Sequence, residues 1–149
     1  MIVLADNKFV KITLNKELFL VSVTWKAYAI SLEDYQYAFS VALDFQESQE
    51  FPIYNFVSDL REQNVVPPHF RLWFQEIAIP RAVRQGLRRA AVVTDAGVFK
   101  RYYLNHVMNT TKKFGLPLKL FKAPESAYNW FKSCLEEDLA NPEIVVLKS

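Results

Sequence analysis

The sequence predicts a single α/β domain, residues 1–149, with a mixed sheet of about five strands and helices packed on it. Three observations carry this prediction. Short β-branched or aromatic runs alternate with longer amphipathic segments, prolines and glycines separate them, and 51% of the residues are hydrophobic. Such alternation favours parallel strands that are joined by right-handed crossovers through helices.

The first elements form an antiparallel hairpin. Residues 8–14 and 18–28 are strand patterns rich in β-branched and aromatic side chains, with Asn15 and Lys16 in a short polar turn between them. Residues 1–5 are apolar, but they lack the basic start and the long apolar run of a signal peptide.

A first helix is expected over about 32–46. Ser31 stands at the capping position, and Asp34 follows three residues later, where Glu or Gln is usual in a capping box. An apolar stripe at helical spacing then follows: Tyr35, Ala38, Phe39, Ala42 and Leu43. Residues 53–57 form a short apolar run that is typical of a strand covered on both faces.

A second helix is expected between Pro68 and Pro80. Pro67 and Pro68 suit a first helical turn, where a missing N–H costs little, and Pro80 is expected to end the helix. Its predicted buried face consists of Phe70, Trp73, Phe74, Ile77 and Ala78.

The remaining elements are a strand, a helix, a strand and a helix. They are expected at 89–94, 98–114, 118–121 and from Pro124 to about 137, with Gly115 ending the third helix. The predicted order is therefore β-β-α-β-α-β-α-β-α, with the core at about 8–137. In the tail, 140–149, residues 144–147 could pair as an edge strand or with a neighbouring subunit.

Bulk charge and cysteine usage exclude some classes of protein. The net charge of +2 is too balanced for a dedicated nucleic-acid binder, so no nucleic-acid partner is expected. Cys134 is the only cysteine, which excludes an intrachain disulfide and favours a reduced, cytoplasmic setting. No stretch approaches the roughly 20 apolar residues of a membrane span.

Ligands on open α/β sheets usually bind beyond the carboxyl ends of the strands. The candidate binding residues expected there, or at the start of the second helix, are Ser58, Asp59, Arg61, His69, Thr94 and Asp95. They predict a polar pocket for a small ligand or a partner peptide. The alternative is that Asp59 pairs with Arg61 while Thr94 and Asp95 cap the third helix.

Four arginines lie within nine residues between the second helix and the fourth strand: Arg81, Arg84, Arg88 and Arg89. They could hold a phosphate or an acidic partner. The alternative is a solvated surface that nearby acidic residues offset.

Catalytic and cofactor signatures do not emerge from the sequence. Three glycines form no phosphate loop, and no Gly-x-Ser-x-Gly elbow is present. Asp59, Thr94 and Lys122 resemble the phosphoacceptor set of a response-regulator receiver, but Asn15 and Lys16 stand where its Mg²⁺-binding acidic pair would lie. We therefore expect no metal, no cofactor and no enzymatic activity.

The element order and a set of residues resemble STAS domains, and in particular small stand-alone bacterial SpoIIAA-like proteins. The residues that carry the resemblance are Trp25, Asp59, Leu60, Arg61, Trp73, Pro80, Gly86, Ala127, Trp130 and Phe131. The resemblance implies a SpoIIAA-like sheet and a regulatory or signalling module that works by protein interaction, possibly as a homodimer.

A switchable member of that family would carry a phosphorylatable Ser or Thr in the loop before the second helix, and residues 60–69 contain neither. The expected function is thus a non-catalytic interaction module without this switch. The alternative is a protein of the same fold that binds a lipid or an anionic metabolite, because the aromatic residues exceed what one apolar stripe per helix requires. The related lipid-binding CRAL-TRIO fold implies such an apolar pocket.

Overall fold

The computed structural model describes residues 1–26, 29–48, 50–63, 67–95 and 98–140. The six strands are β1 (Ile2–Asp6), β2 (Val10–Asn15), β3 (Leu20–Trp25), β4 (Asn55–Asp59), β5 (Arg89–Val93) and β6 (Leu118–Phe121). The helices are α1 (Leu32–Glu47), α2 (Pro68–Trp73), the π-helical turn η1 (Phe74–Ala78), α3 (Ile79–Arg84), α4 (Val98–Lys113) and α5 (Pro124–Ala140).

The sheet is mixed, and its strands lie in the order of the sequence, β1-β2-β3-β4-β5-β6. Strand β2 is antiparallel to both of its neighbours, β1 and β3, and β3 to β6 are parallel. Each parallel neighbour is reached through a helical connection. The α/β class, the mixed sheet and the β2–β3 hairpin that the sequence predicts are confirmed.

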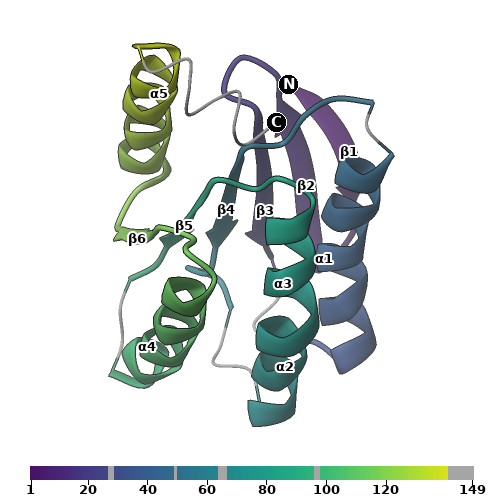
Figure 1. The fold of residues 1–149 in the computed structure, drawn as a ribbon. Coiled ribbons are helices and arrows are strands. Elements are labelled where there is room, and N and C mark those ends of the chain that lie inside the picture. Colours follow the sequence, from purple (N-terminus) through teal and green to yellow (C-terminus); the bar gives the residue numbers. More distant parts are fainter. Residues whose placement is uncertain (27–28, 49, 64–66, 96–97, 141–149) are drawn as a thin grey trace.

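The helices divide unequally between the two faces of the sheet. The three crossover connections, from β3 to β6, have the same handedness and each leads to the next strand along the sheet, so their helices lie on the same face. Figure 1 shows α1, the segment from α2 to α3, and α4 side by side on this face. Helix α5 follows the last strand and packs on the opposite face, against β4, β5 and β6. Alternate residues of β4 and β5 therefore face different helices.

Strand β1 is a correction to the expectation of about five strands. It pairs antiparallel with β2, and Asn7 makes the turn between them by accepting hydrogen bonds from the N–H groups of Phe9 and Val10, each at 3.0 Å. A run of five residues at the chain end carries little period-2 signal, so pairing with β2 defines the strand.

Pro80 does not end the second helix, which is a further correction. The helix continues to Arg84, and the π turn η1 ends at Ala78, two residues before Pro80, with the N–H of Ile79 donating to the carbonyl of Phe74. The wider turn makes room for a residue that has no N–H to donate. It also turns the buried face: Ile79 is buried, whereas Ile77, predicted on that face, is 52% exposed.

Several local predictions are confirmed. The hydroxyl oxygen of Ser31 accepts a hydrogen bond from the N–H of Asp34 at 3.1 Å and caps α1, and Gly115 follows α4 with φ of +67°. Strand β4 begins two residues later than expected and extends to Asp59. The predicted strand end at 27–28 and the tail from 141 lie outside the described residues, among which no helix is long and apolar enough to cross a membrane.

Candidate functional site

Ser58 marks the carboxyl end of the sheet on the face covered by α1 to α4. It is the last residue but one of β4, is 6% exposed, and its hydroxyl oxygen accepts a hydrogen bond of 3.1 Å from the indole N–H of Trp25. Trp25 ends β3 and is itself fully buried. The hydrogen bond therefore joins two parallel strands on their helix-covered face.

A pair of tyrosines extends this polar group toward α4. The ring of Tyr35, in the first turns of α1, stacks on Trp25 with centroids 5.7 Å apart, and its hydroxyl lies 3.1 Å from that of Tyr103 on α4. Burial raises the pKa of both phenols, and raises that of Tyr35 well above its ordinary value. Both are therefore protonated at neutral pH, and each carries one hydroxyl proton.

Gln63, in the loop after β4, is buried with an unsatisfied donor. The residue is 5% exposed, and its amide nitrogen Nε2 has no hydrogen-bond partner within the described part of the chain. Its backbone N–H donates to the carbonyl of Leu60 at 3.1 Å, which fixes the loop. Buried polar groups are almost always paired, so an orphaned donor calls for a physical explanation.

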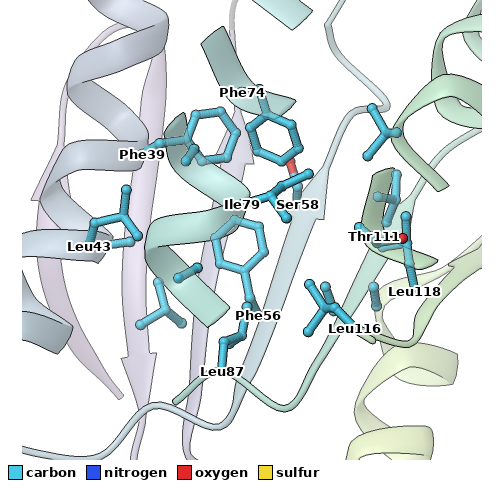
Figure 2. A pocket seen from close by; sticks show the side chains of 18 of the residues that line it. Phe39, Leu43, Phe56, Ser58, Phe74, Ile79, Leu87, Thr111, Leu116 and Leu118 are labelled. Atoms are coloured by element: carbon cyan, nitrogen blue, oxygen red, sulfur yellow. The ribbon is translucent and has the colours of Figure 1, made fainter. Parts of the chain in front are cut away.

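These four polar side chains line a cavity of about 80 Å³ between the sheet and the helices that cover it. We call it the helix-side cavity. Apart from the polar groups its wall is apolar, and Figure 2 shows Phe74 and Ile79 on one side, Phe56 below them, and Thr111, Leu116 and Leu118 across the space. The cavity extends from the carboxyl ends of the strands along the space between α3 and α4.

Small side chains and the π turn explain why the helices leave this space open. Five alanines line the cavity, from α1, from the segment η1 to α3, and from β5: Ala42, Ala78, Ala82, Ala90 and Ala91. Helix α4 is held across the gap by Gln75 of η1, whose side-chain amide donates to the carbonyl of His106 at 2.9 Å and to the hydroxyl of Thr110 at 2.8 Å. Hydrogen bonds thus join η1 to α4 across the space between them, which apolar side chains do not fill.

Asp59 follows Ser58 directly but points to the opposite face, because neighbouring residues of a strand alternate. It pairs with Arg61, whose Nε and Nη2 donate to the carboxylate at 3.0 and 2.7 Å. This pairing raises the pKa of the guanidinium. The two residues border a polar hollow of about 190 Å³ together with Thr24 and Tyr128, separate from the helix-side cavity.

The remaining predicted strand-end residues do not join either space. His69 is exposed, and its ring packs edge-on against Phe70 with centroids 4.8 Å apart. Thr94 is buried and its N–H donates to the carbonyl of Phe121 at 2.9 Å, while Asp95 is exposed. Of the six candidates, Ser58 alone lines the helix-side cavity.

The four arginines occupy different sites. Arg81 donates to Asp44 at 2.9 Å and also to Glu47, both on α1, and Arg84 is exposed. Arg88 and Arg89 are buried and share the carboxylate of Asp138 on α5, at 3.2 and 2.7 Å, and the guanidinium of Arg88 also lies 3.6 Å from the ring centroid of Tyr54. The structure does not bring the four guanidinium groups together at one anion site.

Metal and thiol chemistry receive no support from the described ranges. They contain no group of three or more His, Cys, Asp or Glu side chains placed to hold a metal ion. Burial raises the pKa of the Cys134 thiol, which lowers the fraction of reactive thiolate at neutral pH.

Sequence reasoning missed most of the helix-side cavity. The sequence predicts Tyr35 and Phe39 only as core residues on the apolar stripe of the first helix, it gives Tyr103 no role beyond the general surplus of aromatics, and no signal in it points to Gln63. The surplus of aromatic residues was the one available clue. Comparisons with protein-family models, with curated proteins and with solved structures found no match.

Proposed function

We propose that this protein binds a small apolar molecule in the helix-side cavity. The observation that carries the proposal is the cavity itself, since protein interiors are close-packed and have few voids larger than a water molecule. By the scaling found for engineered cavities, an empty space of this volume costs about 2 kcal/mol of stability. A ligand that fills it would recover the lost contacts.

The shape and wall of the cavity support a binding role without catalysis. Trp25, Tyr35 and Phe39 make a rigid aromatic wall at one side, where ring centroids lie 4.9 to 5.8 Å apart. Ser58, Gln63 and the two tyrosines lie at the carboxyl ends of the strands, the usual ligand position in open α/β sheets. The tyrosines are protonated at neutral pH, so they can orient a ligand but not abstract a proton from it.

Ala90 offers a direct test because its side chain lies on the cavity floor. Ala90→Ile adds three carbons to the space. We expect native mass spectrometry of the wild-type protein, purified from its own host, to show a bound small molecule that Ala90→Ile lacks. We expect small apolar compounds to raise the melting temperature of the wild type only; a compound present at 100 times its Kd adds about 2.7 kcal/mol.

The variant also controls for misfolding, because filling the cavity should raise its own melting temperature. Equal ligand-induced shifts in both proteins would contradict the proposal. So would a wild-type protein that carries no ligand and responds to no compound in a panel of small ketones, alkanes, aromatics and short acyl chains.

A second proposal concerns protein interaction, and it is the one that the STAS-like resemblance implies. Its support is the outer side of the helix from α2 to η1, where Leu72 and Ile77 are 47% and 52% exposed. We propose that the chain has a SpoIIAA-like fold and forms a homodimer, in which this side of the helix contacts a second copy of the chain. Light scattering should then show a dimer for the wild type and a monomer for a Leu72→Glu, Ile77→Glu variant. A monomeric wild type would contradict this second proposal alone.

A further inference from the structure

We propose that the ligand of the helix-side cavity presents a neutral hydrogen-bond acceptor, a carbonyl oxygen of the ketone, ester or amide class, to Gln63 and Ser58. This inference rests on the proposed function and adds the chemistry of the ligand's polar end. It follows from an inventory of the hydrogen-bonding groups that line the cavity.

Gln63 supplies the first donor. Gln63 lines the cavity, and its Nε2 is buried and has no partner among the residues that the structure describes. Leaving such a donor unpaired is unfavourable, and a ligand acceptor would satisfy it.

Gln46 shows that a buried glutamine in the same wall need not be unpaired. Its Nε2 donates to the carbonyl of Ile53 at 3.2 Å, and its side chain is as deeply buried as that of Gln63. The side-chain amide of Gln46 is thus paired, whereas that of Gln63 is not. Of the two glutamines, only Gln63 lies in a loop at the carboxyl ends of the strands.

Ser58 and the tyrosine pair supply two more donors. The oxygen of Ser58 already accepts from Trp25, and its own proton has no acceptor among the described residues. Of the two phenol protons of Tyr35 and Tyr103, the hydrogen bond between them uses one. The other remains as a donor. The polar end of the cavity is therefore rich in donors, which a ligand oxygen with two lone pairs can meet.

The wall of the cavity argues for a neutral ligand. No Lys, Arg, His, Asp or Glu stands among the described residues that line it, and an unpaired ion would be costly in such a space. Arg71 on α2 is a cation whose charge acts on Tyr103, where it lowers the pKa against the effect of burial. It does not line the cavity, although its Nε is buried and has no partner among the described residues.

Five-membered rings that differ only in the polar group make matched probes of the polar end of the cavity. The probes are cyclopentanone, cyclopentane, cyclopentanecarboxylate and cyclopentylamine. Binding is followed by titration in ¹H–¹⁵N spectra of the full chain, where the side-chain amide signals of Gln63 and Gln46 report separately.

We expect cyclopentanone to move the Gln63 amide signals and leave those of Gln46 in place, with cyclopentane binding but moving neither. Gln63→Met should weaken cyclopentanone binding about fivefold and change cyclopentane binding less than twofold. Gln46→Met is the matched control, and it should affect the two probes equally.

The outcomes separate this inference from the proposed function. If no probe binds, the proposed function fails as well. If cyclopentane and cyclopentanone bind while Gln63→Met weakens both equally or neither, the cavity binds ligands but the carbonyl assignment is wrong. Preferential binding of the carboxylate would contradict a neutral ligand and would assign the anion to Arg71. Preferential binding of the amine would contradict the conclusion that the cavity side chains offer hydrogen-bond donors to the ligand.

Discussion

The two faces of the sheet are packed differently. On the α5 face Phe131 and Ala127 are fully buried against Leu20, Val57 and Ala91, and Asp138 holds the buried pair Arg88 and Arg89. At the strand ends of this face lies the polar hollow beside Asp59 and Tyr128. On the other face three helical segments leave the helix-side cavity open and bridge it with hydrogen bonds from Gln75 and Tyr35.

Around the middle of β5, close packing under α5 and incomplete packing under α3 and α4 thus occur on opposite sides of the same strand. Ala90 and Ala91 are neighbours on β5 and both border the cavity, but Ala90 packs with Ile79 and Val107 on the cavity side, whereas Ala91 packs with Phe131 under α5. Because binding a ligand requires space, the looser face is where we place function, and the α5 face supplies the rigid support.

The largest expected effect comes from the closed face. Asp138→Ala leaves two buried guanidinium groups without their shared carboxylate, and breaking a buried pair in this way costs about 3 kcal/mol. Chemical denaturation should show this loss, whereas Glu136→Gln, at an exposed position of the same helix, should stay within about 0.5 kcal/mol of the wild type. A loss below about 1 kcal/mol for Asp138→Ala would mean that α5 does not depend on this pair.

Neighbouring substitutions on β5 test the contrast between the faces most simply. Ala90→Ile should stabilise the protein by about 1 kcal/mol because it fills empty space. Ala91→Ile should destabilise it by about 1 to 3 kcal/mol because it overpacks the contact with α5. Denaturation midpoints that move in the same direction for both variants would remove the distinction between the two faces.

The two buried glutamines should also respond with opposite signs. Gln63→Met removes an unsatisfied donor and should raise the unfolding free energy of the ligand-free protein by about 1 kcal/mol. Gln46→Met removes a hydrogen bond and leaves the carbonyl of Ile53 unpaired, so it should lower the unfolding free energy by about the same amount. Thermal melts measured at identical ligand-free conditions would check this, and a destabilised Gln63→Met would show that its amide is satisfied.

The smallest effect concerns the tyrosine pair and alkaline pH. Both phenols have pKa values above that of a free tyrosine, so their contribution to stability is complete below pH of about 10 and is lost as the pH rises further. A Tyr35→Phe, Tyr103→Phe variant should lose stability less steeply between pH 10 and 11 than the wild type, as measured by denaturation. Parallel slopes would show that the pair does not titrate with unfolding.

Much of the fold could be predicted because its signals are local. The Ser31 cap, Gly115 and the apolar stripe of α1 define elements whose bounds the structure reproduces. The extent of the second helix could not be predicted from the sequence. Pro80 normally ends a regular α-helix, but it is accommodated after a π turn, and the formation of that turn depends on tertiary packing. β1 likewise depends on its pairing with β2.

The candidate site was harder to predict than the fold. Proximity to the carboxyl end of β4 led to Ser58 and Asp59 together, but alternation along the strand sends them to opposite faces. Gln63 is a candidate binding residue only because it lies beside the cavity, and its position there cannot be predicted from the sequence. The cavity exists because small alanine side chains from α1, from the segment η1 to α3, and from β5 meet in space, so no single segment of the sequence predicts it.

The most direct test of the central claim is a crystal structure determined under xenon pressure, because xenon enters dry apolar cavities and leaves close-packed cores empty. We predict xenon density between α3 and α4, within reach of Ile79, Ala90 and Val107, and none beside Phe131 under α5. A helix-side cavity without xenon, or xenon at both faces, would contradict the account.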